Sequence, residues 1–365
     1  MKLWKSWAMG GIDLANATPE VALILAAGFG SRLRPQTKTL KPLTRVLHLT
    51  LAERSVCTLL DAGIRRFLVT VGHETETVRA HFSDIARRRG VTIDFVEAEN
   101  WEGGNGASAL AAKGRTGNAP FFLVMTDHLF DPGIARALAD DPPAPGEMRL
   151  AVDHDKDAIF DLDDVTRVKI EDGRIKEIDK ALDDWDAGDT GVMLCTSGLF
   201  EGLERAAACK KHGLSDGLRE LAREGRARTV DVPGMSWLDV DTHEDLREAE
   251  RRLMRDQGRK TRDGPVSRHL NRPVSRWLTR YLVRTSVTPN QISLASWMMS
   301  CIAAGLMAQR LQGASYFRLG RDVRVFIIFF GALLNLPLVT LGVVALVMNV
   351  EVVRRIVVCA RADTK

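Results

Sequence analysis

A glycine-rich loop with two cations close behind it is the pattern in this sequence best suited to chemistry. The loop follows a short apolar run and reads Leu25-Ala26-Ala27-Gly28-Phe29-Gly30-Ser31-Arg32-Leu33; Lys41-Pro42-Leu43 begins nine residues after Arg32. Glycine lets the backbone approach a phosphate and direct N–H groups at its oxygens. Arg32 and Lys41 would place positive charge where it builds up on an α-phosphate and a departing pyrophosphate. A Gly-x-Gly alone fits any dinucleotide fold, whereas its combination with Arg32 and the Lys-Pro-Leu triplet is specific.

This combination resembles the sugar-phosphate nucleotidyltransferase superfamily, and the resemblance covers Val21 to Leu253. It implies that Arg32 and Lys41 are catalytic. It also implies that the loop binds the nucleoside triphosphate, through Leu25, Ala26, Ala27, Gly28, Gly30 and Ser31.

The same resemblance predicts a Mg²⁺ site. Asp127, in Met125-Thr126-Asp127-His128, matches the aspartate that binds the ion after the middle strand. Asp239, in Trp237-Leu238-Asp239, completes the site, and Asp241 is the alternative. A divalent ion between two carboxylates and a triphosphate would neutralise charge and hold the attacking and leaving oxygens in line.

Two further segments match the family's substrate contacts. The run Trp101 to Ser108 lies where family members read the base, and its Asn-Gly pair looks like the cytidylyltransferase version. The resemblance therefore predicts CTP as the nucleotide, bound through Gly104, Asn105, Gly106 and Ser108. The acceptor is expected beside Ile178-Asp179-Lys180 and Asp189-Thr190-Gly191-Val192, with Lys180, Asp189 and Thr190 as its contacts.

Alternating strands and helices must position these residues. The apolar pattern predicts strands at 21–25, 66–71, 92–96 and 121–125, with helices at 51–62 and 76–88 between them. This alternation predicts an α/β fold with a mostly parallel, Rossmann-like sheet covered on both faces. We assign residues 20–257 to this nucleotidyltransferase domain and residues 1–19 to a loose N-terminal tail.

Short, charged strands follow from Asp153 to Ile178, with Asp172-Gly173 as a hairpin turn signal. They are expected to form one wall of the substrate pocket. The domain should close with a helix over residues 243–254, for which Thr242 is a suitable N-cap with Asp245 three residues later.

Charge is distributed unevenly along the 365 residues. From Arg259 onward there are 16 Lys/Arg against 4 Asp/Glu, whereas the preceding part has 35 against 43. Within 258–289 an arginine recurs every fourth residue from Arg268 to Arg284, which on a helix traces one basic face. We interpret 258–289 as a basic juxtamembrane helix that binds anionic membrane lipids, with a solvated helix face as the alternative. The long uncharged runs that follow favour a membrane over nucleic acid as the partner.

Residues 290–358 are predicted to be a truncated transmembrane helical region, with uncharged runs at 292–309 and 325–350. Several motifs resemble the entry to the membrane domain of bifunctional enzymes that join inositol-1-phosphate cytidylyltransferase to a CDP-alcohol phosphotransferase: Asp263-Gly264-Pro265-Val266-Ser267, Asn271-Arg272-Pro273, Ser275-Arg276 and Thr288-Pro289-Asn290-Gln291-Ile292-Ser293. The aspartate-rich signature of the phosphotransferase is absent, so we expect that second activity to be lost. The expected location is the cell membrane, with the catalytic domain facing the cytoplasm.

Together these patterns predict an enzyme that transfers CMP from CTP to a phosphorylated polyol, with inositol 1-phosphate preferred, and releases pyrophosphate. Two alternatives stay open. One is a sugar-1-phosphate nucleotidyltransferase that uses UTP or dTTP, and the other is a non-catalytic, membrane-tethered nucleotide-binding protein.

Overall fold

A computed structural model of the chain describes residues 19–30, 32–33, 37–117 and 119–259, with 285, 287, 290–291, 293–299 and 301. Contacts divide the chain into two compact units, Met1–Ser286 and Val287–Lys365. In the second unit, the described residues from 290 onward are helical. The predictions for the tail, the basic helix and the transmembrane region fall almost wholly outside the described residues. Among the residues that are described, no helix combines the length and the apolar character needed to cross a membrane.

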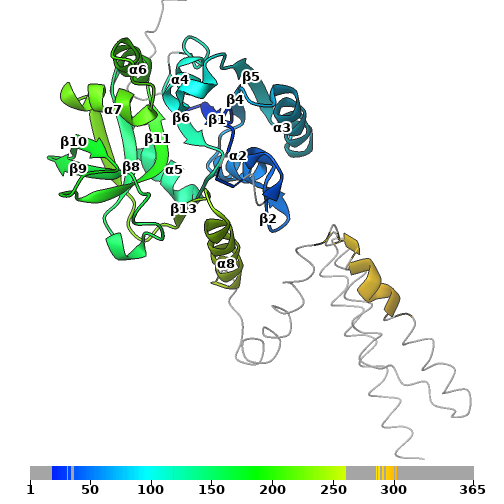
Figure 1. Ribbon diagram of the computed structural model, residues 1–365. Coiled ribbons are helices and arrows are strands. Elements are labelled where there is room, and N and C mark those ends of the chain that lie inside the picture. The colour runs from blue at the N-terminus through cyan, green and yellow to red at the C-terminus, as the bar shows by residue number, and fades with distance from the viewer. Residues whose placement is uncertain are drawn as a thin grey trace, which may run out of the picture. The chain divides into compact units, whose positions relative to one another are not determined.

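A nine-stranded sheet organises the first unit, in the order β5-β4-β1-β6-β11-β8-β12-β10-β9 (Figure 1). Its first four strands are parallel neighbours and coincide with the predicted ones: β1 Val21–Leu25, β4 Arg66–Val71, β5 Thr92–Glu97 and β6 Phe121–Met125. The α/β fold is therefore confirmed.

The second half of the sheet departs from a simple parallel arrangement. It contains β8 Met148–Asp153, β9 Arg167–Glu171, β10 Arg174–Asp179, β11 Ala187–Cys195 and β12 Ala227–Asp231. Strand β11 inserts between β6 and β8 and is antiparallel to both, and β10 is antiparallel to β12 and β9. Because β9 also pairs with β11, five strands of this half close on themselves. The sheet is mostly parallel in direction, but β10 and β11 run against the other seven strands.

The β9–β10 hairpin turns where the sequence predicts it. Asp172 and Gly173 have φ angles of 51° and 70°. Two consecutive positive φ values are those of a type I′ turn, whose twist matches that of the flanking strands.

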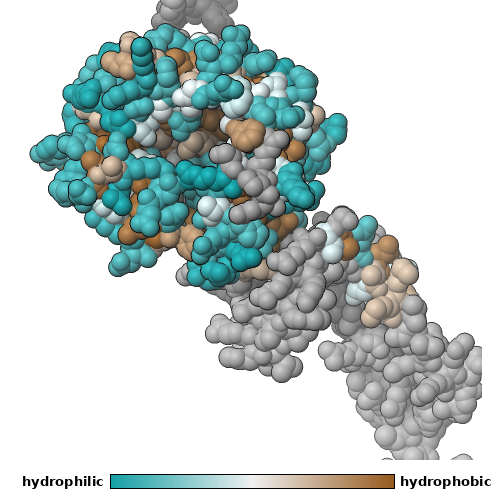
Figure 2. Space-filling model, in the orientation of Figure 1, coloured by the Kyte–Doolittle hydropathy of each residue, from teal (hydrophilic) through white to brown (hydrophobic). Residues whose placement is uncertain are grey.

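Helices cover the sheet on both faces, as predicted. Side chains of β1 alternate, so that Ala22 and Ile24 enter one apolar core and Leu23 and Leu25 enter another. The first core is covered by α2 Leu51–Asp61, α3 Thr75–Arg89 and α5 Pro132–Asp140. The second is covered by α4 Asn105–Leu110, α6 Gly198–Ala208 and α7 Leu214–Arg223. In Figure 2, hydrophilic side chains cover most of the visible face of this unit, with apolar ones in the recesses between them.

Short elements surround the edge where the parallel strands end. They are the 3₁₀ turns η2 Lys41–Leu43, η3 Trp101–Gly103 and η4 Lys156–Ala158, and the strands β2 Arg45–Val46, β3 Leu49–Thr50, β7 His128–Phe130 and β13 Trp237–Asp239. The closing helix, α8, spans His243–Arg259 and so continues past the predicted end at Met254 and the predicted domain boundary at 257. The Thr242 cap is confirmed, because its hydroxyl accepts the Asp245 backbone N–H at 3.2 Å.

Glu53 joins α2 to α3 through a buried carboxylate. Arg88 donates to it at 2.5 and 3.1 Å, and Arg89 donates at 2.8 and 3.0 Å, both from the last turn of α3. Burial raises the pKa of Glu53, but the bonds from the two arginines outweigh that effect and lower it. The carboxylate is therefore charged and fully used by its partners.

We expect Glu53→Gln to lower the free energy of unfolding by about 2 kcal/mol, because the buried acceptor loses its charge while two guanidinium groups still face it. Urea unfolding of the full chain measures this. Asp84→Asn removes the exposed partner that Arg88 binds at 2.8 Å and serves as the control, with no measurable change expected. An equal loss in both variants would contradict a special role for Glu53.

Candidate active site

The carboxyl ends of β1 and β6 place the glycine loop beside Asp127. The two strands are parallel, with Leu25 opposite Met125 in the register. The loop that follows Leu25 and the Thr126-Asp127 pair that follows Met125 therefore leave the sheet side by side. Such a crevice at the carboxyl edge is where open α/β sheets bind ligands.

Glycine at position 30 lets the loop approach Lys41 closely. Gly30 has a φ of 66°, and a Cβ built on it would lie 2.8 Å from the Cβ of Lys41. Gly28 is exposed, whereas the side chains of Leu25, Ala26 and Ala27 are buried. Part of their backbone is used within the protein, since the Ala26 N–H donates to Thr70 and the Ala27 carbonyl accepts from His73, each at 3.0 Å. Ser31 lies outside the described residues.

A two-stranded ribbon brings the C-terminal aspartates to the same place. Strand β13 pairs antiparallel with β7, with Asp239 opposite His128. The backbone N–H of Val240 donates to the carbonyl of Asp127 at 3.1 Å. Residues more than 100 positions apart thus share one corner of the domain.

The predicted cations and carboxylates form a continuous series of ion pairs, which we call the charge chain. Lys41 binds Asp127 at 2.6 Å and also binds Asp241. Arg32 binds Asp241 at 3.0 Å and Asp164 at 2.6 Å. Lys180 binds the other oxygen of Asp164, also at 2.6 Å. The structure therefore brings Arg32, Lys41, Asp127, Asp241 and Lys180 together, and adds Asp164, which the sequence did not indicate.

Burial and pairing fix the charge states at the centre of this chain. Burial lowers the pKa of Lys41, but Asp127, Asp239 and Asp241 outweigh it and raise the pKa. Burial raises the pKa of Asp127, but Lys41 and His128 outweigh it and lower the pKa. Lys41 is therefore charged at neutral pH, as catalysis at a triphosphate requires.

Asp239 differs from the other two aspartates because no described lysine or arginine binds it, and the nearest cation is the His128 ring, whose Nδ1 lies 4.0 Å from Asp239 Oδ1. Its Oδ1 is buried and has no hydrogen-bond partner among the described residues. Burial, and repulsion from Asp127 and Asp241, raise the pKa of Asp239 to about 6. Ligand atoms of Asp127, His128 and Asp239 all lie within 4.8 Å of one another. A divalent cation fits this place, since it would satisfy the buried oxygen and compensate the charge.

His128 is a part of the site that the sequence prediction missed. Its Nδ1 lies 2.7 Å from Asp127 Oδ1, and its ring occupies the space next to Gly191, where a Cβ would lie 1.9 Å from the ring. Gly191 has a φ of 74°, so glycine is favoured there by backbone conformation as well. Because Mg²⁺ prefers oxygen ligands, His128 is better suited to orienting Asp127 than to binding the ion. The adjacent Asp127-His128 pair in the sequence was the signal that could have indicated this role.

Asp245 holds Asp241 in position. From the sequence, Asp245 is expected only to cap α8. Its Oδ2 accepts the backbone N–H groups of Asp241 and Thr242 at 3.0 and 2.6 Å. The carboxylate is buried, so the turn that carries Asp241 is tied to the first turn of α8.

A cavity of about 270 Å³ adjoins the charge chain and Asp239. The predicted site residues that line it are Asn105, Asp127, Lys180, Asp189, Asp239 and Asp241. Thr190, predicted to contact the acceptor, is not brought to this cavity: its hydroxyl is fully buried and donates to the carbonyl of Ala151 at 2.9 Å. Successive side chains of a strand point to opposite faces, which separates Thr190 from Asp189.

The segment predicted to read the base forms the start of α4 and packs on the start of α7. The Asn105 side chain accepts the backbone N–H of Leu214 at 2.8 Å, and a Cβ on Gly106 would lie 2.6 Å from the carbonyl of His212. Gly104 has a φ of 124°, and the Ser108 hydroxyl donates back to its carbonyl at 3.2 Å. These contacts give a structural reason for the Gly-Asn-Gly run at 104–106. Its predicted role in recognising the base of the nucleotide stays a prediction.

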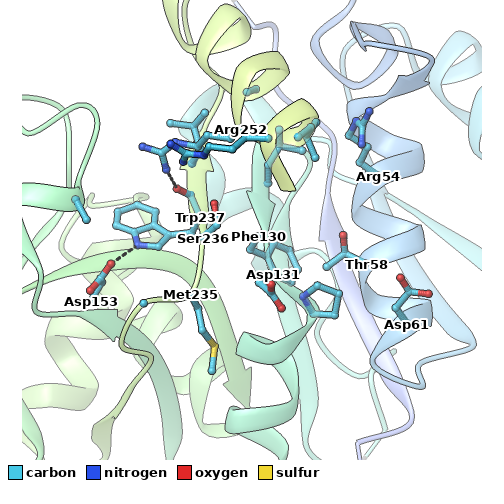
Figure 3. A pocket seen from close by; sticks show the side chains of 18 of the residues that line it. Arg54, Thr58, Asp61, Phe130, Asp131, Asp153, Met235, Ser236, Trp237 and Arg252 are labelled. Atoms are coloured by element: carbon cyan, nitrogen blue, oxygen red, sulfur yellow. Dashed lines mark hydrogen bonds between the residues drawn. The ribbon is translucent and has the colours of Figure 1, made fainter. Parts of the chain in front are cut away.

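A second, larger cavity of about 820 Å³ lies behind β13 (Figure 3). Trp237 lines both cavities and donates from its indole nitrogen to Asp153 at 2.9 Å, so it forms part of the wall between them. Arg54, Thr58 and Arg252 line the larger cavity, and none of the predicted site residues does. The smaller cavity is therefore the candidate active site.

Comparison with known proteins agrees with this geometry. A family model described as a MobA-like NTP transferase domain matches residues 22–230. The chain belongs to this family. The prediction of a nucleotidyltransferase is thereby confirmed for the domain that carries the charge chain.

Two curated relatives of this NTP transferase are named bifunctional IPC transferase and DIPP synthase. The protein from Rubrobacter xylanophilus is 39% identical over 80% of this chain and 66% of its own length. The protein from Aquifex aeolicus is 32% identical over 78% of this chain and 63% of its own length. The match thus covers a little under two thirds of these relatives.

Two solved structures share the fold. The inositol-1-phosphate CTP transferase from T. maritima has a TM-score of 0.58 and 24% identity, over 65% of this chain and 97% of that one. A UDP-glucose pyrophosphorylase complexed with UDP-glucose has a TM-score of 0.55 and 18% identity, over 65% and 99%. At these identities the likeness concerns the fold.

The raised pKa of His128 makes the stability of the metal-free domain depend on pH. Burial lowers this pKa, but Asp239 and Asp127 outweigh it and raise the pKa to about 9, from 6.5. The protonated ring therefore stabilises the fold fully below about pH 6.5, and this contribution is lost as the pH rises through 9. In EDTA, we expect the free energy of unfolding to fall by on the order of 2–3 kcal/mol from about pH 6.5 to about pH 9.5.

Urea unfolding across that pH range checks this expectation. His128→Gln keeps a donor for Asp127 but does not titrate, so its profile should be flatter. Identical slopes for both proteins would contradict a buried, charged histidine.

Proposed function

We propose that this domain transfers CMP from CTP to the phosphate of a polyol phosphate, with inositol 1-phosphate as the preferred acceptor. The observation that carries the proposal is the meeting of Lys41 with Asp127 and Asp241, next to a buried oxygen of Asp239 that has no hydrogen-bond partner among the described residues. The names of the curated relatives and the fold shared with an inositol-1-phosphate CTP transferase favour CTP and this acceptor.

The reaction needs little from the protein beyond position and charge. An oxygen of the acceptor's phosphate attacks the α-phosphorus of CTP. The bond from that phosphorus to the oxygen bridging the β-phosphate breaks, and pyrophosphate leaves with the electron pair. Because the phosphate nucleophile is ionised at neutral pH, no general base is required. Lys41 and Arg32 would stabilise the charge that collects on the α-phosphoryl group and the pyrophosphate.

Asp127 and Asp239 would hold Mg²⁺. The ion supplies positive charge to the triphosphate and restrains its oxygens. His128 donates to Asp127 and fixes the orientation of that carboxylate, and Asp245 fixes the turn that carries Asp241. On the other side of the cavity, Lys180 and Asp189 lie where the acceptor would bind.

An activity matrix tests the substrates. The full chain is incubated with Mg²⁺, with each of CTP, UTP, dTTP, ATP and GTP against inositol 1-phosphate, glucose 1-phosphate and glycerol 3-phosphate, and pyrophosphate release is measured. We expect the highest kcat/KM for CTP with inositol 1-phosphate. Preference for UTP or dTTP with glucose 1-phosphate would replace the proposal, and CTP binding without turnover would indicate a non-catalytic protein.

Lys41→Ala should reduce kcat by about two to three orders of magnitude, because the lost cation acts on charge that develops in the transition state. Lys113→Ala is the matched control, since that lysine is exposed and paired with Glu204. Pyrophosphate release by both variants measures the effect. A rate for Lys41→Ala equal to that of the control would remove Lys41 from the mechanism.

A further inference from the structure

The segment of residues 159–166, between η4 and β9, forms one wall of the small cavity. Ile159, Phe160, Asp161, Asp164, Val165 and Thr166 all line it. The segment is packed in place: a Cβ on Gly188 would lie 2.7 Å from Ile159 and 3.1 Å from Val165. Its last carbonyl, on Thr166, accepts the backbone N–H of Asp189 at 2.9 Å. Asp164 is thus presented to the cavity by a segment with fixed ends.

Asp164 joins two cations that come from distant parts of the chain. Its Oδ2 binds Arg32, next to the glycine loop, and its Oδ1 binds Lys180, after β10, each at 2.6 Å. These are the cations expected to meet the α-phosphate and the acceptor's phosphate. The Asp164 side chain is 31% exposed, so a ligand in the cavity can reach it. One carboxylate therefore stands between two cations in the way a bound phosphate would.

We propose that Asp164 is a displaceable counterion that occupies the place of the acceptor's phosphate, so that a phosphate monoester must displace it to bind Arg32 and Lys180. This inference rests on the proposed function only in that the acceptor is a phosphate monoester. In the free protein, Asp164 holds Arg32 and Lys180. A phosphate monoester carries close to two negative charges at neutral pH, so it competes for the two cations better than one carboxylate does.

The same competition favours release of the product. When the acceptor's oxygen has bonded to the α-phosphorus, the acceptor's phosphate is part of a diphosphate diester and carries one negative charge. Asp164 then meets a singly charged competitor for Arg32 and Lys180. The phosphate of the substrate displaces the Asp164 carboxylate from the two cations. The carboxylate binds them again as the product leaves. This makes Asp164 a residue that sets how tightly the site holds an anion, rather than a catalytic one.

Titration calorimetry of the full chain tests the proposal without turnover. The probes are inorganic phosphate, inositol 1-phosphate and CDP-inositol, added to wild type, Asp164→Asn and Asp163→Asn. Asp163 is an exposed neighbouring acid and is the matched control. We expect Asp164→Asn to bind inorganic phosphate, inositol 1-phosphate and CDP-inositol each about tenfold more tightly than wild type, because all three must displace the same carboxylate. Asp163→Asn should match wild type.

Unchanged or weaker phosphate binding in Asp164→Asn would overturn the proposal, because Asp164 would then only position the two cations. Asp164→Ser provides a second neutral variant, and Lys180→Met in the Asp164→Asn background should abolish the gain. The inorganic phosphate arm does not depend on which polyol is the acceptor. A gain there, with no turnover of CTP and inositol 1-phosphate, would retain this inference and reject the proposed function.

Discussion

Asp127, Asp239 and Asp241 lie around a single, mostly buried lysine at the edge of the small cavity. Three carboxylates at such short separations repel one another, and burial raises the free energy of each charged group. Lys41 compensates two of them directly, and His128 donates a further hydrogen bond to Asp127. Much of the surrounding structure serves this compensation: glycine at position 30 brings the loop against Lys41, and the β7–β13 pairing places Asp239 opposite His128.

The compensation is incomplete at Asp239, and this bears on function. Its buried oxygen has no hydrogen-bond partner among the described residues, and its pKa is raised to about 6. A site with a carboxylate oxygen that a further cation would bind is suited to a substrate that arrives with a metal ion. The exposed end of the charge chain is balanced differently, because Arg32 and Lys180 share Asp164. At the Asp239 end of the charge chain, a bound cation would compensate the remaining negative charge. At the Asp164 end, we propose that one anion replaces another.

The two halves of the sheet supply different residues to the candidate active site. The parallel half, from β5 to β6, supplies the glycine loop and Asp127 at its carboxyl edge. The half that closes on itself supplies Lys180 after β10, Asp189 on β11 and Asp164 before β9. The proposed nucleotide contacts therefore come from the regular part of the fold, and the proposed acceptor contacts come from the irregular part.

Local sequence determined the parallel strands, the glycine loop with its two cations, and the Asp172-Gly173 and Thr242 turns, because each depends on neighbouring residues only. It also identified Asp127 and Asp239 through family motifs. Tertiary structure decided that Asp241 pairs with both cations, that Asp164 joins Arg32 to Lys180, that His128 supports Asp127, and that Thr190 faces the core. The ion pairs of Arg32 with Asp164 and of both cations with Asp241 join residues more than 100 positions apart. Charge partners across such separations follow from strand order, which the periodicity of a sequence does not contain.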